Sequence, residues 1–170
     1  MTTNIPRETK KIYITGEIND TLANEIQLML LNEGSTIAPL RMIINSKGGS
    51  VYPALGIINV MDLASYPIET ECDGIAAGTA AIILAMGEKG HRYAHMDSRI
   101  VIMYAKSSQE DNAAVIGEIR KLNKEMISIL ANHTNKTEKE ICIAIEKAKG
   151  ELYMTAKEAK SFGIVDEILD

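Results

Sequence analysis

The sequence predicts a single α/β domain built on a mostly parallel sheet. Short β-branched runs alternate with longer segments of helical periodicity along the 170 residues, and no repeat, Pro-rich linker or low-complexity tract interrupts them. Helices that cross back between successive strands imply a parallel sheet covered by helices on both faces. The chain is 46% hydrophobic but only 4% aromatic, so its core must be mainly aliphatic.

The N-terminal part contains two predicted strand-to-helix units. They comprise a strand at residues 11–15, a helix capped by residues 19–21 and stopped by Gly34, a strand at residues 40–44 and a helix at residues 51–64. A Gly-rich turn, residues 45–49, joins the last two. Pro53 fits this helix only because it lies in the first turn, where a missing N–H costs no hydrogen bond.

The same order of strand, turn and helix returns further along the chain. The predicted elements are a strand at residues 68–72, a small-residue helix at 78–86, a strand at 99–103 and a long amphipathic helix from about 111 to 131. Two capping boxes, Thr137 with Glu140 and Thr155 with Glu158, open two more helices, which Gly150 and Gly163 close. Residues 164–168 are either a last strand or an exposed apolar strip.

Composition excludes several classes of function. A formal net charge of −5 argues against nucleic acid or an anionic membrane as a partner. The longest uncharged run, residues 74–87, is too short to cross a bilayer, and no secretory segment is visible, which predicts a cytoplasmic protein. Cys72 and Cys142 lack the spacing of a metal or redox motif and are expected to be two buried thiols. No cofactor and no metal site are expected.

Two glycine-containing turns are the candidate chemical sites. Gly48-Gly49 and Gly78-Thr79 each lie where a strand ends and a helix begins, and the first backbone N–H groups of a helix are unpaired. A pair of such donors could stabilise an oxyanion, as acyl transfer requires. The alternative is that the glycines only permit tight turns.

Six collinear segments carry a resemblance to a known family. They are TGEI at residues 15–18, IINSKGGSV at 43–51, GIAAGTAA at 74–81, the stretch from MGEKGHRYA to DSRIVI at 86–102, LANHT at 130–134 and YMTAKEAKSFGIVDEI at 153–168. On these segments the chain resembles the proteolytic subunits of the Clp protease family, serine peptidases that form barrel-shaped rings. The resemblance implies stacked ββα units of the crotonase type, with a head at about residues 11–103 and 150–170 and a handle at about 104–149.

The family's Ser-His-Asp triad does not survive at the matching positions. Gly78 stands where the resemblance implies the nucleophilic serine, and Met103 where it implies the general-base histidine. Counting back from Tyr153 places Glu151 at the orienting aspartate. Glycine has no hydroxyl, and a thioether cannot accept a proton at neutral pH. Without a triad, only about 10³- to 10⁴-fold acceleration over water remains, which is too little for a working peptidase.

The family's oxyanion hole, by contrast, is expected to persist. The resemblance assigns its donors to the backbone N–H groups of Gly49 and Thr79. Lys47 replaces the family's usual proline, which puts the rigidity and the charge of that loop in question.

Other residues could in principle replace the triad. The candidates are Thr79, Ser46, Ser50, His91 and His95. The Thr79 side chain is expected to point about 100° further round the helix than that of residue 78, with no histidine placed to activate it. His133 matches a family histidine outside the triad and is expected to be structural. His91 and His95 have i, i+4 spacing, but they lie in an extended or loop segment and predict no metal site.

The resemblance also bears on partners. Active family members receive substrate from a ring ATPase through an N-terminal hairpin, which this chain is expected to lack, and through an apolar cleft. At the cleft positions Ile43 and Leu63 remain apolar, but four others are polar or charged: Arg41, Glu71, Asp73 and His95. Buried charges there are expected to lack partners, so ATPase docking is doubtful.

Ring formation through the head is favoured over a stacked double ring. The family's Gly-rich strand before the handle helix is replaced by the polar run 105–110, so the ring contacts of the head are expected to persist and the stacking contacts of the handle are not. Heptamers are expected, alone or mixed with an active paralogue, and a peptide is a possible ligand.

Three hypotheses on function follow. The favoured one is a non-proteolytic, ring-forming homologue with a structural or regulatory role. The second is an active serine-type peptidase that uses displaced residues. The third is a crotonase-like acyl-CoA enzyme that uses the oxyanion hole without a serine, although no CoA-binding segment is evident.

Overall fold

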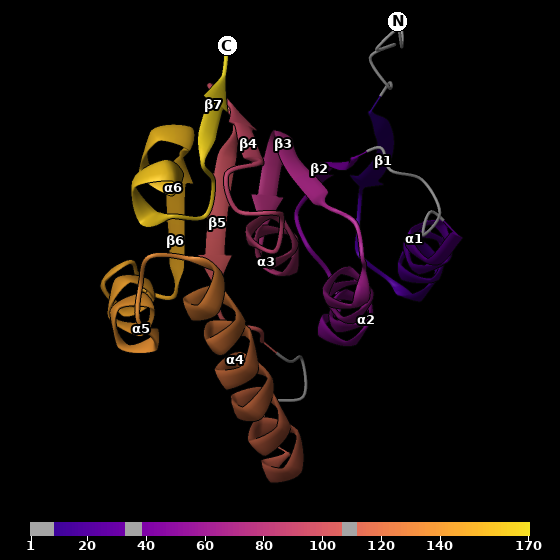
Figure 1. The fold of residues 1–170 in the computed structure, drawn as a ribbon. Helices are drawn as coiled ribbons and strands as arrows, with labels where there is room; N and C mark the ends of the chain where they lie inside the picture. Colours follow the sequence, from indigo (N-terminus) through magenta and orange to yellow (C-terminus); the bar gives the residue numbers. More distant parts are fainter. Residues whose placement is uncertain (1–8, 33–38, 107–111) are drawn as a thin grey trace, which may run out of the picture.

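The computed structural model describes residues 9–32, 39–106 and 112–170, which form a mixed α/β fold (Figure 1). Its strands are β1 (Lys10–Thr15), β2 (Leu40–Ser46), β3 (Ile68–Ala77), β4 (Arg92–His95), β5 (Arg99–Met103), β6 (Glu151–Thr155) and β7 (Glu167–Leu169). Its helices are α1 (Asp20–Asn32), α2 (Val51–Leu63), α3 (Thr79–Ala85), α4 (Ala113–His133), α5 (Glu138–Lys147) and α6 (Ala156–Phe162). The predicted fold class is confirmed.

The sheet is parallel except at one pair of strands. Its main order is β1-β2-β3-β4-β7, with every pair parallel. The long strand β3 pairs with β4 along its first half and with β5 along its second half. Strand β5 then pairs with β6 in antiparallel register. The C-terminal ends of β2 and β3 therefore lie side by side, and the chain turns there into α2 and α3.

Helices cover one face of the sheet, and the other face is partly exposed. Along β1 and β2 the side chains of Ile12, Ile14, Met42 and Ile44 are buried on the helix-covered face. The alternate residues point the other way, because successive side chains of a strand face opposite sides. Tyr13 among them is 58% exposed. The expectation that both faces are covered is therefore wrong for this part of the sheet.

Local signals in the sequence located most of the helices. Both predicted capping boxes are present. The hydroxyls of Thr137 and Thr155 each accept a hydrogen bond from the backbone N–H three residues on, and the side chains of Glu140 and Glu158 accept hydrogen bonds from the backbone N–H groups of these threonines. Gly163 ends α6 in the left-handed conformation. The predicted stop at Gly34 lies outside the described residues.

The C-terminal segment resolves the open alternative for residues 164–168. Ile164 and Val165 are buried, and β7 follows them at the edge of the sheet beside β4. Helix α4 extends away from the sheet, below the other elements in Figure 1. No helix among the described residues is both long and apolar enough to cross a membrane.

Candidate functional site

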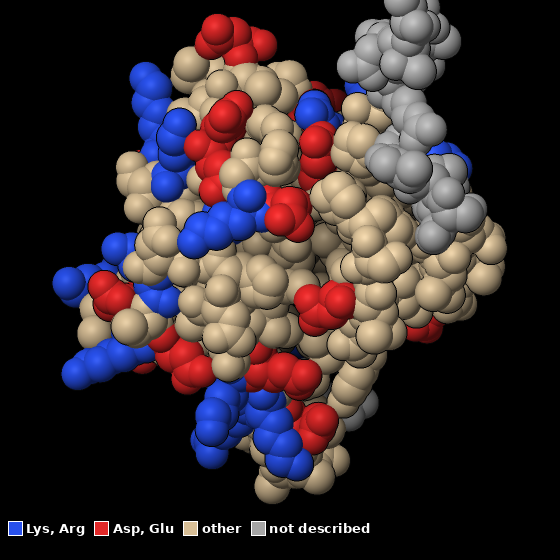
Figure 2. Space-filling model, in the orientation of Figure 1, with Lys and Arg blue, Asp and Glu red and all other residues tan. Residues whose placement is uncertain are grey.

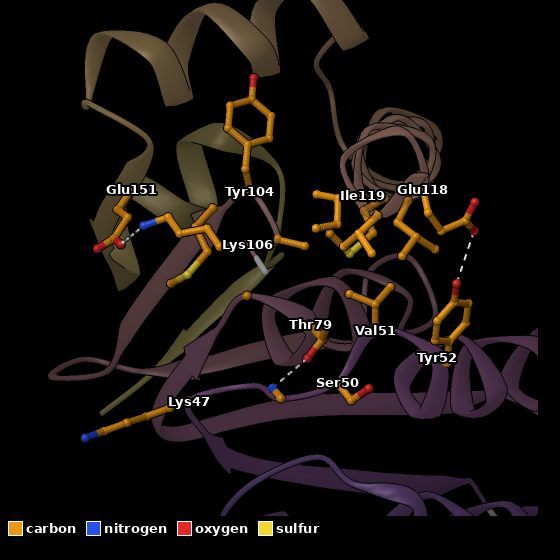
Figure 3. Close-up of a pocket in the computed structure, with 17 residues that line it drawn as sticks. Lys47, Ser50, Val51, Tyr52, Thr79, Tyr104, Lys106, Glu118, Ile119 and Glu151 are labelled. Carbon is orange, nitrogen blue, oxygen red and sulfur yellow. Dashed lines mark hydrogen bonds and ion pairs between the residues drawn. The ribbon is translucent and has the colours of Figure 1, made fainter. Parts of the chain in front are cut away.

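A cleft of about 730 Å³ lies where the two glycine-containing turns meet helix α4 (Figure 3). Its floor comes from the turn before α2 and from the start of α3, and α4 forms the opposite wall. The lining residues are Lys47, Gly49, Ser50, Val51, Tyr52, Gly78, Thr79, Met103, Tyr104, Ala105, Lys106, Val115, Glu118, Ile119, Leu122, Met126 and Glu151. All five residues that the sequence singled out as triad or oxyanion-hole positions are among them.

Position 78 faces position 103. Gly78 joins β3 to α3 with φ +55° and ψ −121°, a conformation that glycine adopts without the steric cost it has for other residues. Its N–H donates to the carbonyl of Val101 on the neighbouring strand at 2.9 Å. A Cβ built on Gly78 would lie 3.8 Å from Cγ and 3.9 Å from Sδ of Met103. A side chain at position 78 would therefore contact the one at position 103.

Position 151 lies beside position 103 on the adjacent strand. Met103 and Glu151 are partners in the antiparallel register of β5 and β6. The Glu151 carboxylate pairs with Nζ of Lys106 at 2.9 Å and accepts a hydrogen bond from the Tyr153 hydroxyl at 3.2 Å. The hydrogen bond from Lys106 is the main cause that lowers the pKa of Glu151. Positions 78, 103 and 151 thus converge, but they bring together a glycine, a thioether and a carboxylate that is already paired.

The turn before α2 is held rigidly although it contains Lys47. Gly48 O accepts from the Ile18 N–H at 3.0 Å, and the Ser50 N–H donates to Ile18 O at 2.9 Å. Gly48 N–H donates to Oγ of Ser46 at 3.0 Å. The Lys47 side chain is exposed and points away from the middle of the cleft (Figure 3). These hydrogen bonds supply the rigidity that the replacement of proline by lysine put in question.

Gly49 is required by the close approach of this turn to Ile18. A Cβ at position 49 would lie 2.3 Å from the carbonyl oxygen of Ile18. We expect Gly49→Ala to lower the free energy of unfolding by about 1–3 kcal/mol, because the turn must move to relieve the contact. Urea denaturation monitored by circular dichroism measures this change.

Gly117→Ala is the matched control for that variant. A Cβ at Gly117, in the interior of α4, meets nothing within 4 Å. Alanine favours a helix interior over glycine, so this variant should gain about 0.5–1 kcal/mol. Equal stability losses in the two variants would contradict the close approach at position 49.

One of the two expected oxyanion donors is occupied. The Gly49 N–H donates a hydrogen bond of 3.1 Å to Oγ1 of Thr79 (Figure 3). The Thr79 side chain is buried, with 5% of the residue exposed. The sequence analysis considered Thr79 as a backbone donor and as a replacement nucleophile, and did not predict its hydroxyl as an acceptor within the cleft.

The residues that could replace the triad are dispersed. Ser50 and Thr79 line the cleft, but no histidine is among its described lining residues. The Ser46 hydroxyl is buried and donates to Gly16 O. His133 is at the end of α4, where burial lowers its pKa. No hydroxyl in the described part of the cleft therefore has a neighbouring imidazole.

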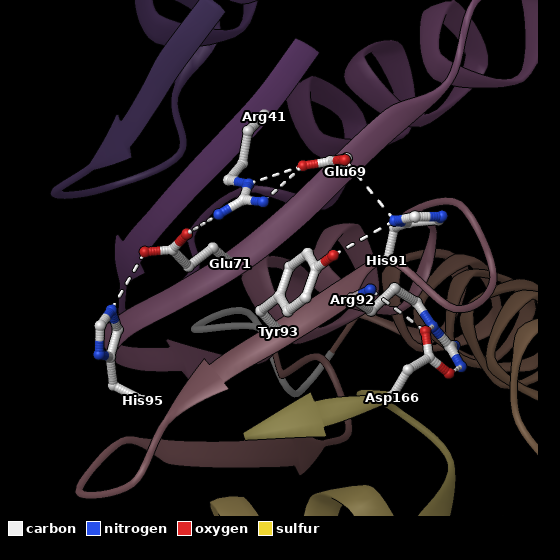
Figure 4. A network of polar contacts seen from close by, with 8 residues as sticks. All are labelled: Arg41, Glu69, Glu71, His91, Arg92, Tyr93, His95 and Asp166. Atoms are coloured by element: carbon white, nitrogen blue, oxygen red, sulfur yellow. Dashed lines mark hydrogen bonds and ion pairs between the residues drawn. The ribbon is translucent and has the colours of Figure 1, made fainter. Parts of the chain in front are cut away.

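His91 and His95 belong to a polar network on the exposed face of the sheet (Figure 4). Arg41 of β2 is at its centre, with Nε and Nη2 both 2.7 Å from Glu69 Oε2 and Nη1 2.9 Å from Glu71. His95 Nε2 lies 3.1 Å from Glu71 Oε1, and His91 Nδ1 lies 3.6 Å from Glu69 Oε1.

The expectation that these charges lack partners is wrong. Arg41 also lies 4.5 Å above the ring of Tyr93. The predicted polar positions, Arg41, Glu71, Asp73 and His95, lie together and contact one another across three strands: Arg41 pairs with Glu71, and His95 Nε2 lies 3.1 Å from Glu71 and 3.9 Å from Asp73. This surface is polar and satisfied rather than apolar.

A second charged cluster, formed by Arg92 and Asp166, was not predicted from the sequence. Arg92 is 3% exposed, and its Nη2 lies 2.6 Å from Oδ1 of Asp166. Its Nη1 also donates to the carbonyls of His133 and Ala85. Arg92 thus joins β4 to the ends of α3 and α4 and to the segment before β7. A charged residue in a short strand gives no sequence signal of such burial.

The two cysteines differ in burial. Cys72 is fully buried on β3, as expected, and burial raises the pKa of its thiol. Cys142 is only partly buried, which corrects the prediction of two buried thiols. Among the described residues, no group of three or more His, Cys, Asp or Glu side chains is placed to hold a metal ion.

Comparison with known proteins shows close relatives. A sequence model of the Clp protease family matches residues 3–170. The ATP-dependent Clp protease proteolytic subunit of Bacteroides fragilis (strain ATCC 25285) is 36% identical over 165 residues, which cover 93% of this chain and 78% of that protein. The ATP-dependent Clp protease proteolytic subunit 1 of Thermobifida fusca (strain YX) is 36% identical over 169 residues, covering 95% of this chain and 75% of that protein.

Proposed function

This chain belongs to the Clp protease family, and on that premise we propose that it is a non-proteolytic, ring-forming subunit with a structural or regulatory role. The observation that carries the proposal is the pair Gly78 and Met103. A side chain at position 78 would meet residue 103 at 3.8 Å, yet neither residue can supply a nucleophile or a proton acceptor. Glu151, the third position, has a lysine rather than a histidine as its partner.

The curated relatives favour a second candidate, an active peptidase. They are named proteolytic subunits of an ATP-dependent Clp protease. Two aliphatic hydroxyls, those of Ser50 and Thr79, line the cleft of this chain. Nucleophilic catalysis by a hydroxyl needs an adjacent base. The described part of the cleft offers two carboxylates, Glu151, which Lys106 engages, and Glu118, which accepts from the Tyr52 hydroxyl and pairs with Lys121. This geometry favours the non-proteolytic role.

A crotonase-like acyl-CoA enzyme is the third candidate. The apolar wall that α4 contributes, Val115, Ile119, Leu122 and Met126, suits an acyl chain as well as a peptide. A bound thioester in the purified protein would support this function over the other two.

We further propose that the subunit assembles into a heptameric ring through its head, alone or with an active paralogue. Family membership supports self-association, and a peptide held in the cleft without cleavage is the ligand that fits the proposal.

On the face shown in Figure 2, basic and acidic side chains lie interspersed. The internally paired network around Arg41 supports weak or absent docking of a ring ATPase, and a cytoplasmic location stays a prediction.

The proposed function is tested by activity and assembly measured on the same sample. We expect hydrolysis of a fluorogenic peptide ester to stay far below the rate of a working peptidase, at most the residual acceleration that remains without a triad, together with a stable ring in native mass spectrometry. Saturable hydrolysis that withstands removal of trace proteases by repeated chromatography would refute the non-proteolytic role. A monomer at micromolar concentration would refute the ring.

A further inference from the structure

The Thr79 hydroxyl lies where a ligand's oxygen would have to lie. An oxyanion hole is a set of backbone donors with no partner of their own in the resting protein. The Gly49 N–H has a partner, because Thr79 Oγ1 accepts its hydrogen bond at 3.1 Å. The N–H of an exposed turn would otherwise point into the cleft and be available to a carbonyl or carboxylate.

The neighbouring backbone holds both partners of this hydrogen bond in place. Thr79 is the first residue of α3 and is 5% exposed, so its side chain has little room to turn elsewhere. Gly48 has no side chain, and a Cβ there would lie 3.1 Å from Thr79 Oγ1 and 2.5 Å from Ala77 O. The turn itself is fixed by its hydrogen bonds to Ile18. Donor and acceptor are thus held by separate elements, β2–α2 and β3–α3, that the sheet brings together.

We propose that Thr79 determines the specificity of the cleft by closing the candidate oxyanion hole with its own hydroxyl. The inference rests on the proposed function, since it concerns the same cleft. A peptide carbonyl or carboxylate must displace one intramolecular hydrogen bond before it can bind Gly49. Ligands then bind by side chains placed against the apolar wall formed by Val51, Ile119 and Leu122, rather than by a polarised carbonyl.

Hydrogen exchange at Gly49 tests the contact directly in the full chain. In Thr79→Val, which removes the hydroxyl and keeps the shape, we expect the Gly49 amide to exchange about tenfold faster or more than in the wild type. Thr79→Ser is the matched control and should retain protection, because it keeps the acceptor. The amides of Gly48 and Ser50 donate to Ser46 and Ile18 instead and should be unchanged.

A binding measurement tests the consequence for specificity. N-acetyl-leucine, which combines a carboxylate with an aliphatic side chain, is titrated into the wild type, Thr79→Ala and Thr79→Ser by calorimetry. We expect Thr79→Ala to bind it about three- to tenfold more tightly than the other two proteins, because the carboxylate can then bind the Gly49 N–H without first displacing the Thr79 hydroxyl.

Two results would overturn the inference. One is equal exchange at Gly49 in the wild type and Thr79→Val, or an increase shared equally by Gly48 and Ser50, which would assign Thr79 only a general role in holding the turn. The other is equal affinity of all three proteins for N-acetyl-leucine. Both readouts are independent of peptidase activity, so failure of the proposed function and failure of this inference are distinguishable.

Discussion

The double variant Gly78→Ser/Met103→His should hydrolyse an activated peptide ester about 10²-fold faster than the wild type. The backbone at position 78 already has the positive φ of a sharp strand-to-helix turn, which a serine would adopt at a cost in strain, and a Cβ built there lies 3.8 Å from Cγ of Met103. A histidine at position 103 would lie beside Glu151 on the adjacent strand. A base next to a hydroxyl contributes about 10²- to 10⁴-fold, and the lower end is expected because Lys106 competes for Glu151.

The single variants provide the controls. Gly78→Ser alone lacks a base, Met103→His alone lacks a nucleophile, and Gly78→Ala/Met103→His matches the double variant except for the hydroxyl. All three should remain at the rate of the wild type, because the members of a triad act as a unit. Activity in any of the three that equals that of the double variant would show that positions 78 and 103 do not form the reactive pair.

Asp166→Ala should lower the free energy of unfolding by about 3–5 kcal/mol, the largest stability effect expected of an exchange at one position here. The variant leaves the Arg92 guanidinium, 3% exposed, without its carboxylate. Removing one partner of a buried pair is costly because the other charge stays desolvated. Asp166 also accepts hydrogen bonds from the N–H groups of Gly90 and Arg92, which fix the segment before β7 to β4.

The ion pair between Arg92 and Asp166 should also make the free energy of unfolding depend on pH in the acid range. Burial opposes ionisation of Asp166, but its hydrogen bonds and charge interaction with Arg92 outweigh this and lower the pKa below 3.8. The folded protein then binds a proton less readily than the unfolded chain, so the contribution of Asp166 is complete above about pH 4 and is lost as pH falls through the folded pKa.

Urea denaturation between pH 2.5 and 7 measures both effects. Arg92→Met is the companion variant, since it removes the buried charge and keeps an unbranched side chain of similar length; it should cost less than Asp166→Ala. A loss below about 1 kcal/mol for Asp166→Ala, or an acid dependence identical to that of the wild type, would contradict the role of this pair.

The sequence predicted the elements that have strong local signals and missed those that lack them. Both capping boxes and the strand at residues 99–103 were located correctly, because caps and β-branched runs are local features. Strands β4 and β6 were not predicted. The first is only four residues long and is anchored by Arg92, and the second, ELYMT, pairs antiparallel with β5 through contacts distant in sequence.

In the candidate site, too, the sequence predicted some features and missed those that depend on tertiary contacts. The resemblance located positions 78, 103 and 151, and the structure brings all three to one cleft. Local sequence could not show that Thr79 Oγ1 accepts from Gly49, because that bond depends on how two separate turns meet. The same holds for Arg41, whose partners lie 28 and 30 residues away on a neighbouring strand. Tertiary pairing, rather than residue type, decides whether such groups are free or satisfied.

The most direct test of the account is the mass of the intact protein after incubation with a fluorophosphonate, which reacts with an activated serine or threonine hydroxyl. We predict that the wild type stays unmodified, because position 78 has no hydroxyl and no imidazole lines the described part of the cleft. Gly78→Ser/Met103→His should gain a single adduct at position 78. A stoichiometric adduct on the wild-type chain, mapped to Ser50 or Thr79, would contradict the claim that this subunit is inactive.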